Sequence, residues 1–122
     1  HPYRISPSDG RPHRAGANPS HYGDSVGRWE GQVFVVDVRN FVDDTWFGED
    51  GYFHSSEMRV TERLWKVGDN IVWQATVEDP KVLTGSWTTP KFLLKRAPQG
   101  VIPHEALCLE PEGFEHMKAI AK

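Results

Sequence analysis

Two stretches of the chain alternate between apolar and polar positions, and each predicts a β-hairpin. Residues 28–38 are rich in β-branched and aromatic side chains, with a tight turn expected at 30–31. Residues 57–67 and 71–77 alternate on either side of the turn sequence at 68–70, which contains glycine, aspartate and asparagine. The second hairpin has the clearer pattern of the two.

The segments outside the two hairpins differ from them in composition and pattern. Residues 1–25 are rich in proline and glycine and predict an irregular arm, and residues 40–52 predict an exposed acidic loop. Residues 87–94 and 101–109 are further strand candidates. Residues 112–122 predict a short C-terminal helix that docks on the sheet through an apolar stripe. That stripe consists of Phe114, Met117, Ile120 and Ala121.

These elements together predict the fold class. About six short strands separated by glycine and proline turns favour a sandwich or barrel over alternating α/β units. A chain of 122 residues has the size of one domain. We therefore predict an all-β fold of jelly-roll or barrel type spanning residues 1–122, with the arm at 1–25 and the helix at 112–122.

Composition and charge narrow the classes of function. The net charge is −3 and the basic residues are scattered, so the basic surface of a nucleic-acid-binding protein is missing. Apolar residues at 38% and charged residues at 25% are typical of a soluble globule and argue against membrane insertion. The single Cys108 cannot form an intramolecular disulfide. The chain begins at His1 rather than Met. Either a signal peptide has been removed or the chain has been trimmed at this point. We expect a secreted or periplasmic protein.

One carboxylate has the parity of the apolar positions in the second hairpin. Glu62 shares its expected strand face with Val60 and Leu64, and burial of an unpaired charge is unfavourable. We therefore expect a partner for it. Either an arginine such as Arg39 or Arg59 forms a salt bridge, or Glu62 is a general acid or base in a cavity.

Six histidines in 122 residues is a high count, and imidazole is a common metal ligand. The chain has no His-x-His or His-Glu-x-x-His pattern, so metal ligands would have to converge from separate segments. His54 lies at the expected entry of a strand, and His104 lies just after the Pro-Gln-Gly turn. His13 lies on the arm, from which it could close over either of them.

The segment around His54 resembles the first motif of the cupin family. The match runs from Gly48 to His54 and continues through Ser56, Glu62 and Gly68. Ser56 stands where the family has its second histidine, and Glu62 lies one place later than the family glutamate.

Residues 98–104 are similar to the second cupin motif, with one extra residue before the histidine. The resemblance implies a jelly-roll barrel with one metal ion near its mouth. If a single unbroken strand joined His54 to Glu62, about 26 Å would separate them, too far to share a metal. The candidate metal ligands are therefore His54, His104 and His13, and Glu62 is an independent interior carboxylate.

Longer motifs spread over most of the chain resemble a family of uncharacterised secreted bacterial proteins rich in β-structure. The resemblance implies export and a β-rich domain but brings no secure activity. Members usually carry more chain before the first of these motifs, and they tend to read Cys-His-Glu where this sequence has Cys108-Leu109-Glu110. The motifs are DGRPH at 9–13, GDSVGRWEG at 23–31, VVD at 35–37, NF at 40–41, TER at 61–63 and EDP at 78–80.

Five tryptophans are more than a small core is expected to hold. Trp73 has inward parity, Trp65 has the parity of the polar face, and Trp46 lies in the acidic loop. Exposed aromatic faces beside acids and amides suit sugar rings, although cross-strand aromatic packing explains any one of them equally well. Trp46, Tyr52 and Trp87 are the candidate substrate-binding residues.

Taken together, these features favour a secreted enzyme with a histidine-bound metal, copper first, that acts oxidatively on a polysaccharide such as cellulose. His54, His104 and His13 would hold the metal, and Glu62 would handle protons. One alternative is a metal-free β-barrel lyase, isomerase or hydrolase that uses the interior Glu62. The other is a carbohydrate-binding or structural module without catalysis. Nucleic acid and membranes are not expected as partners, and a homodimer is left open.

Overall fold

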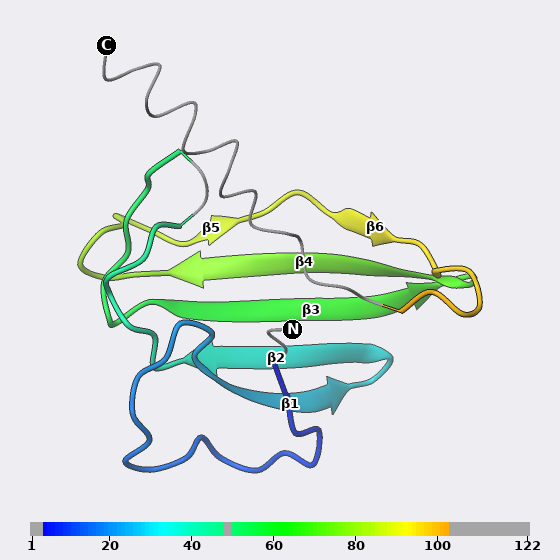
Figure 1. Cartoon of the computed structure of the whole chain (residues 1–122), viewed down its shortest axis with the longest axis horizontal. Helices are drawn as coiled ribbons and strands as arrows, with labels where there is room; N and C mark the ends of the chain where they lie inside the picture. The colour runs from blue at the N-terminus through cyan, green and yellow to red at the C-terminus, as the bar shows by residue number, and fades with distance from the viewer. Residues whose placement is uncertain (1–3, 48–49, 103–122) are drawn as a thin grey trace, which may run out of the picture.

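Six strands form one open antiparallel sheet in the computed structural model, which describes residues 4–47 and 50–102 (Figure 1). The order is β1-β2-β3-β4, and both β5 and β6 pair with β4. The predicted all-β class is therefore confirmed for these residues. The strands are β1 (Asp24–Glu30), β2 (Val33–Arg39), β3 (Arg59–Val67), β4 (Asn70–Glu78), β5 (Trp87–Thr88) and β6 (Phe92–Leu94).

Both predicted hairpins are present. Gly31 and Gln32 join β1 to β2, one residue later than expected, and Gly68 and Asp69 join β3 to β4. Gly31 and Gly68 adopt positive φ angles of 61° and 60°, a backbone region that glycine enters without a steric penalty. The alternating pattern and the turn glycines thus account for the four long strands.

β5 and β6 are two halves of one edge strand, and the predicted strand over 87–94 is confirmed in this broken form. The pairing register with β4 shifts by one residue between them, where Thr89 and Pro90 form a bulge. The amide of Thr89 donates to the carbonyl of Ala75 (2.8 Å), and the amide of Ala75 donates to Thr89 Oγ1 (3.1 Å). Proline has no amide proton, so it is confined to an edge or a bulge.

The two faces of the sheet differ in character because directly opposed residues in an antiparallel ladder share a face. One face carries the core, in which Val36 and Val38 of β2 pack with Val77 of β4, and loop residues Phe41 and Met58 cover them. The opposite face carries polar residues. Its members include Asp24, Asp37, Arg39, Arg59 and Thr61.

The N-terminal arm runs along the free edge of β1 and reaches the sheet near β2 (Figure 1). The amide of Gly27 donates to the carbonyl of Pro7 at 2.6 Å, so the arm satisfies a backbone group of an edge strand. The ring of Phe34 occupies the space where a Cβ of Gly27 would lie. Later in the arm, the carbonyl of Ala17 accepts a hydrogen bond from the side-chain Nδ2 of Asn40 at 2.9 Å.

The predicted closure of the fold into a jelly roll or barrel stays a prediction. A jelly roll has two sheets, and residues 4–47 with 50–102 form one. The predicted helix at 112–122 and most of the candidate strand at 101–109 lie outside the described residues, so both stay predictions. In the described part of the chain, no helix has the length and apolar character needed to cross a membrane.

Candidate functional site

Aromatic side chains from two segments, the loop before β3 and strand β5, converge at the end of the sheet where β2 ends and β3 begins. They surround a cavity of about 660 Å³, a size within the usual range for small-molecule sites. Phe47 and Trp87 meet edge to face at 5.9 Å between ring centroids. The wall consists of Phe47, Tyr52, Phe53, Met58, Val77, Val82, Leu83 and Trp87, with Asp50, Gly51, His54 and Asp79 as its polar members. We call this cavity the aromatic pocket.

Two of the three predicted sugar-binding residues lie in the aromatic pocket. Tyr52 and Trp87 come from separate segments, and 68% and 47% of their surfaces are exposed. Trp46 is 71% exposed and pairs through an isolated β-bridge with Phe53, but it does not line the cavity. Phe47 and Phe53 were missed as wall residues because a loop has no periodicity that predicts which way its side chains point.

Asp79 anchors one wall of the pocket from a buried position. Its carboxylate accepts hydrogen bonds from the Ser55 amide (2.6 Å), the Ser55 hydroxyl (2.7 Å) and the Lys81 amide (3.2 Å). Burial raises the pKa of Asp79, but these hydrogen bonds and the nearby His54 outweigh it, and the net pKa is lowered. Asp79 therefore stays ionised and fastens the segment before β3 to the segment after β4.

His54 lies beside Asp79, and both of its ring nitrogens are engaged. Nδ1 is 3.1 Å from the carbonyl oxygen of Ser55, which can only accept, so Nδ1 donates in this bond. Nε2 is 2.9 Å from the hydroxyl of Thr45. The ring also packs edge-on against Phe41 at 6.1 Å. His54 is thus a buried, hydrogen-bonded side chain that precedes β3 rather than lying at its first position.

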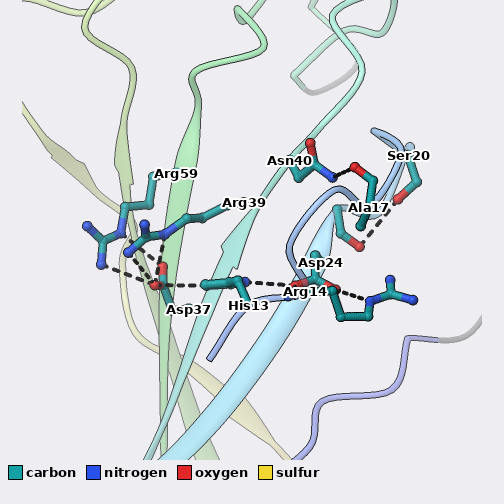
Figure 2. A network of polar contacts seen from close by, with 10 residues as sticks. His13, Arg14, Ala17, Ser20, Asp24, Asp37, Arg39, Asn40 and Arg59 are labelled. Atoms are coloured by element: carbon teal, nitrogen blue, oxygen red, sulfur yellow. Dashed lines mark hydrogen bonds and ion pairs between the residues drawn. The ribbon is translucent and has the colours of Figure 1, made fainter. Parts of the chain in front are cut away.

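A polar network on the opposite face of the sheet holds the arm in place (Figure 2). His13 lies between two buried carboxylates, with Nδ1 2.9 Å from Asp24 and Nε2 3.1 Å from Asp37. Arg39 and Arg59 approach Asp37 from β2 and β3 at 2.8–3.1 Å. The network links the arm to three strands.

The two carboxylates of this network have lowered pKa values. Burial alone raises the pKa of Asp37, but hydrogen bonds from Arg59, Arg39 and His13 more than offset it. Burial likewise raises the pKa of Asp24, and bonds from Arg14, whose Nε is 2.7 Å away, and from His13 reverse the effect. Both groups are therefore anions at neutral pH.

The predicted metal ligands lie in different environments. His13 belongs to the polar network, His54 belongs to the pocket, and His104 lies outside the described residues. Both ring nitrogens of His13 and of His54 are engaged in hydrogen bonds, so neither of these two side chains offers a free nitrogen to a metal in this arrangement. The described ranges contain no group of three or more histidine, cysteine or acidic side chains placed to hold a metal. The copper site and the homodimer stay predictions.

Glu62 is buried on the apolar face, as its parity predicted. Its partners differ from the expected ones. Arg4 of the arm binds one carboxylate oxygen, and the indole of Trp73 donates to the other at 3.1 Å. The expectation of Arg39 or Arg59 was wrong, because those arginines have the opposite strand parity and bind Asp37. Sequence spacing could not reveal a partner 58 residues away.

The chain has no match among protein-family models, curated proteins or solved structures. The site must therefore be interpreted from its own geometry.

Proposed function

We propose that this domain binds carbohydrate and that the aromatic pocket holds a sugar ring. The observation that carries the proposal is the convergence of Tyr52, Phe53 and Trp87 with Phe47 around one cavity of sugar size. Aromatic faces stack on the apolar C–H faces of pyranose rings. Large aromatic surfaces left partly exposed at one place are typical of binding sites.

Polar groups at the mouth of the pocket suit the hydroxyls of such a ligand. Asp50 and Tyr52 are exposed members of the wall, and each brings hydrogen-bonding oxygen atoms. A few polar groups in a mainly apolar pocket are the usual arrangement for orienting a small ligand. An extracellular polysaccharide is the expected source, because the sequence resembles secreted bacterial proteins.

Binding without catalysis agrees with the state of the candidate catalytic groups. Glu62 is held by Arg4 and Trp73, and His54 has both nitrogens engaged. A general acid or base must form a hydrogen bond with the substrate group whose proton it transfers. In Glu62 and His54, the atoms that would do so are already bonded to other protein groups. We therefore prefer the hypothesis of a carbohydrate-binding module to that of an oxidative enzyme.

Affinity electrophoresis in gels containing soluble cellulose derivatives, xylan or mixed-linkage glucan tests the proposal. We expect retardation in at least one gel, followed by calorimetry with the matching hexasaccharide. Trp87→Ala and Tyr52→Ala should each weaken binding by about fivefold or more, because such aromatic contacts contribute about 1 kcal/mol or more.

Trp29→Ala is the matched control. Trp29 is 64% exposed but lies outside the aromatic pocket, so its removal should leave carbohydrate affinity unchanged. The proposal fails if no glycan retards the protein, or if Trp29→Ala weakens binding as much as Trp87→Ala does.

A further inference from the structure

A second apolar surface lies at the other end of the same sheet face. Here five large side chains stand directly opposite one another on successive strands, forming a continuous row. We call this row the apolar ladder. Its members are Trp29, Phe34, Leu64, Trp73 and Phe92.

Neighbouring side chains of the ladder contact one another, but several of them remain exposed to solvent. The rings of Trp29 and Phe34 lie 5.1 Å apart, and those of Trp73 and Phe92 lie 5.7 Å apart. Even so, 64% of Trp29 and 49% of Phe92 remain exposed, as does 47% of the nearby Leu94. A hollow of about 540 Å³ lies along this end of the sheet. Apolar surface of this extent normally marks a contact with another segment or molecule.

At the opposite end of the face, loop residues do cover the core. Phe41 and Met58 are buried on Val36, Val38 and Val77. Among the described residues, the arm reaches this face through Arg4 and Pro7, next to the middle of the ladder, but Trp29 and Phe92 at its two ends stay 64% and 49% exposed. The covering element is therefore to be sought elsewhere.

We propose that the C-terminal segment of this chain, residues 112–122, docks on the apolar ladder as an amphipathic helix. The place where the described chain ends supports this choice. Leu94, Lys95 and Arg96 already line the hollow, and the described chain ends six residues later, at Ile102. Residues 103–111 can span up to about 30 Å, which is ample to return to the ladder.

The dimensions agree. Eleven residues of α-helix are about 16 Å long, and the five strands that carry the ladder span about 19 Å. A helix over 112–122 can therefore cover four of these five strands. Its apolar stripe recurs at spacings of three and four, so it forms one face. That face consists of Phe114, Met117, Ile120 and Ala121.

The charges are also complementary. Three basic side chains and one acidic side chain, Asp69, line the hollow. The segment that leads into and begins the helix is acidic, with four glutamates between 103 and 115 and no lysine or arginine. Opposite charges steer and align docking partners. The basic residues are Lys66, Lys95 and Arg96, and the glutamates are Glu105, Glu110, Glu112 and Glu115.

Thiol crosslinking in the full-length chain tests the proposal. The only native cysteine is replaced (Cys108→Ser), and Leu64→Cys is combined with Met117→Cys. A short thiol-specific crosslinker should then join the two within one chain, giving a monomer of altered mobility. Ala119→Cys is the matched control, because position 119 lies on the opposite face of the helix and should crosslink to position 64 severalfold less.

A second measurement does not depend on crosslinking. Met117→Asp places a charge on the docked face and should raise the fluorescence of a dye that binds apolar surface severalfold, whereas Ala119→Asp should not. Crosslinks that join two chains would show that a second copy covers the ladder and would overturn the proposal. Equal crosslinking of positions 117 and 119, or equal dye binding by the two aspartate variants, would overturn it as well.

Discussion

The guanidinium of Arg4 binds the carboxylate of Glu62 on the apolar face of the sheet, across 58 residues of chain. Across the sheet, Glu62 of β3 stands opposite Val36 of β2 and Ala75 of β4, so neither directly opposed side chain is polar. Arg4 comes from the arm, and Trp73 supplies the remaining hydrogen bond. The arm therefore neutralises a charge that the sheet itself leaves unpaired.

Removal of this guanidinium should destabilise the fold. Arg4→Met keeps the aliphatic stem but leaves a buried carboxylate with one partner, which we expect to lower the free energy of unfolding by about 1–3 kcal/mol. Urea denaturation measures the change. In a Glu62→Gln background the same replacement should matter much less, because no charge remains to be paired. Arg11→Ala, which removes a fully exposed ion pair with Asp9, should have no measurable effect. Equal losses in both backgrounds would contradict the assignment.

The polar network should make the protein sensitive to acid. The folded pKa values of Asp24 and Asp37 lie below their ordinary value, which is about 3.9 in the unfolded chain. Their stabilisation is therefore complete above about pH 4 to 5 and is lost as the pH falls through the folded pKa values. Thermal unfolding measured from pH 7 to pH 2 should show this loss. Asp37→Asn should flatten the acid limb, whereas Asp43→Asn, in an exposed loop, should leave it steep.

Gly27 should not tolerate a side chain. Its backbone is not in the left-handed region, so the obstacle is the ring of Phe34, which fills the space of a Cβ. We expect Gly27→Ala to destabilise the protein by about 1–3 kcal/mol through overpacking. Gly85→Ala is the control, because nothing lies within 4 Å of a Cβ there. Phe34→Leu should partly rescue Gly27→Ala, and its failure to do so would point away from a steric cause.

Loss of the Asp79 carboxylate should loosen the aromatic pocket. Asp79→Ala leaves the amide and hydroxyl of Ser55 without their acceptor, which we expect to cost about 1–3 kcal/mol of stability. Glycan affinity should fall with it, although Asp79 need not touch the ligand. Asp69→Ala, at the exposed turn after β3, serves as the control. Calorimetry of both variants separates the two effects, and an unchanged affinity in Asp79→Ala would show that the pocket does not depend on this clamp.

The copper prediction has a direct test in His54. Because both of its nitrogens are hydrogen-bonded, we expect His54→Ala to lower the melting temperature by the same amount with copper and with a chelator. The opposite outcome is equally informative. Copper that stabilises the wild type strongly, but not His54→Ala, would show that His54 is a metal ligand. Elemental analysis of dialysed, tag-free protein would then give the stoichiometry.

The hairpins were predictable from the sequence because they depend on local chemistry. Alternation with a period of two decides which residues face the core, and the glycines at 31 and 68 permit the turns. The same alternation placed Glu62 on the inner face. It also gave Trp65 the parity of the polar face. Each of these conclusions uses residues that are close together along the chain.

The partners of these residues were decided by the tertiary structure alone. Periodicity states which face a side chain occupies, but it contains no information on which distant segment will lie across from it. The arm thus brought Arg4 to Glu62 and His13 between Asp24 and Asp37. In the same way, the loop before β3 and the short edge strand β5 brought Tyr52 and Trp87 to one pocket. The sequence by itself determined the sheet and the directions of its side chains, and only the packing of irregular segments onto that sheet decided the site, because contacts between distant segments depend on their path through space.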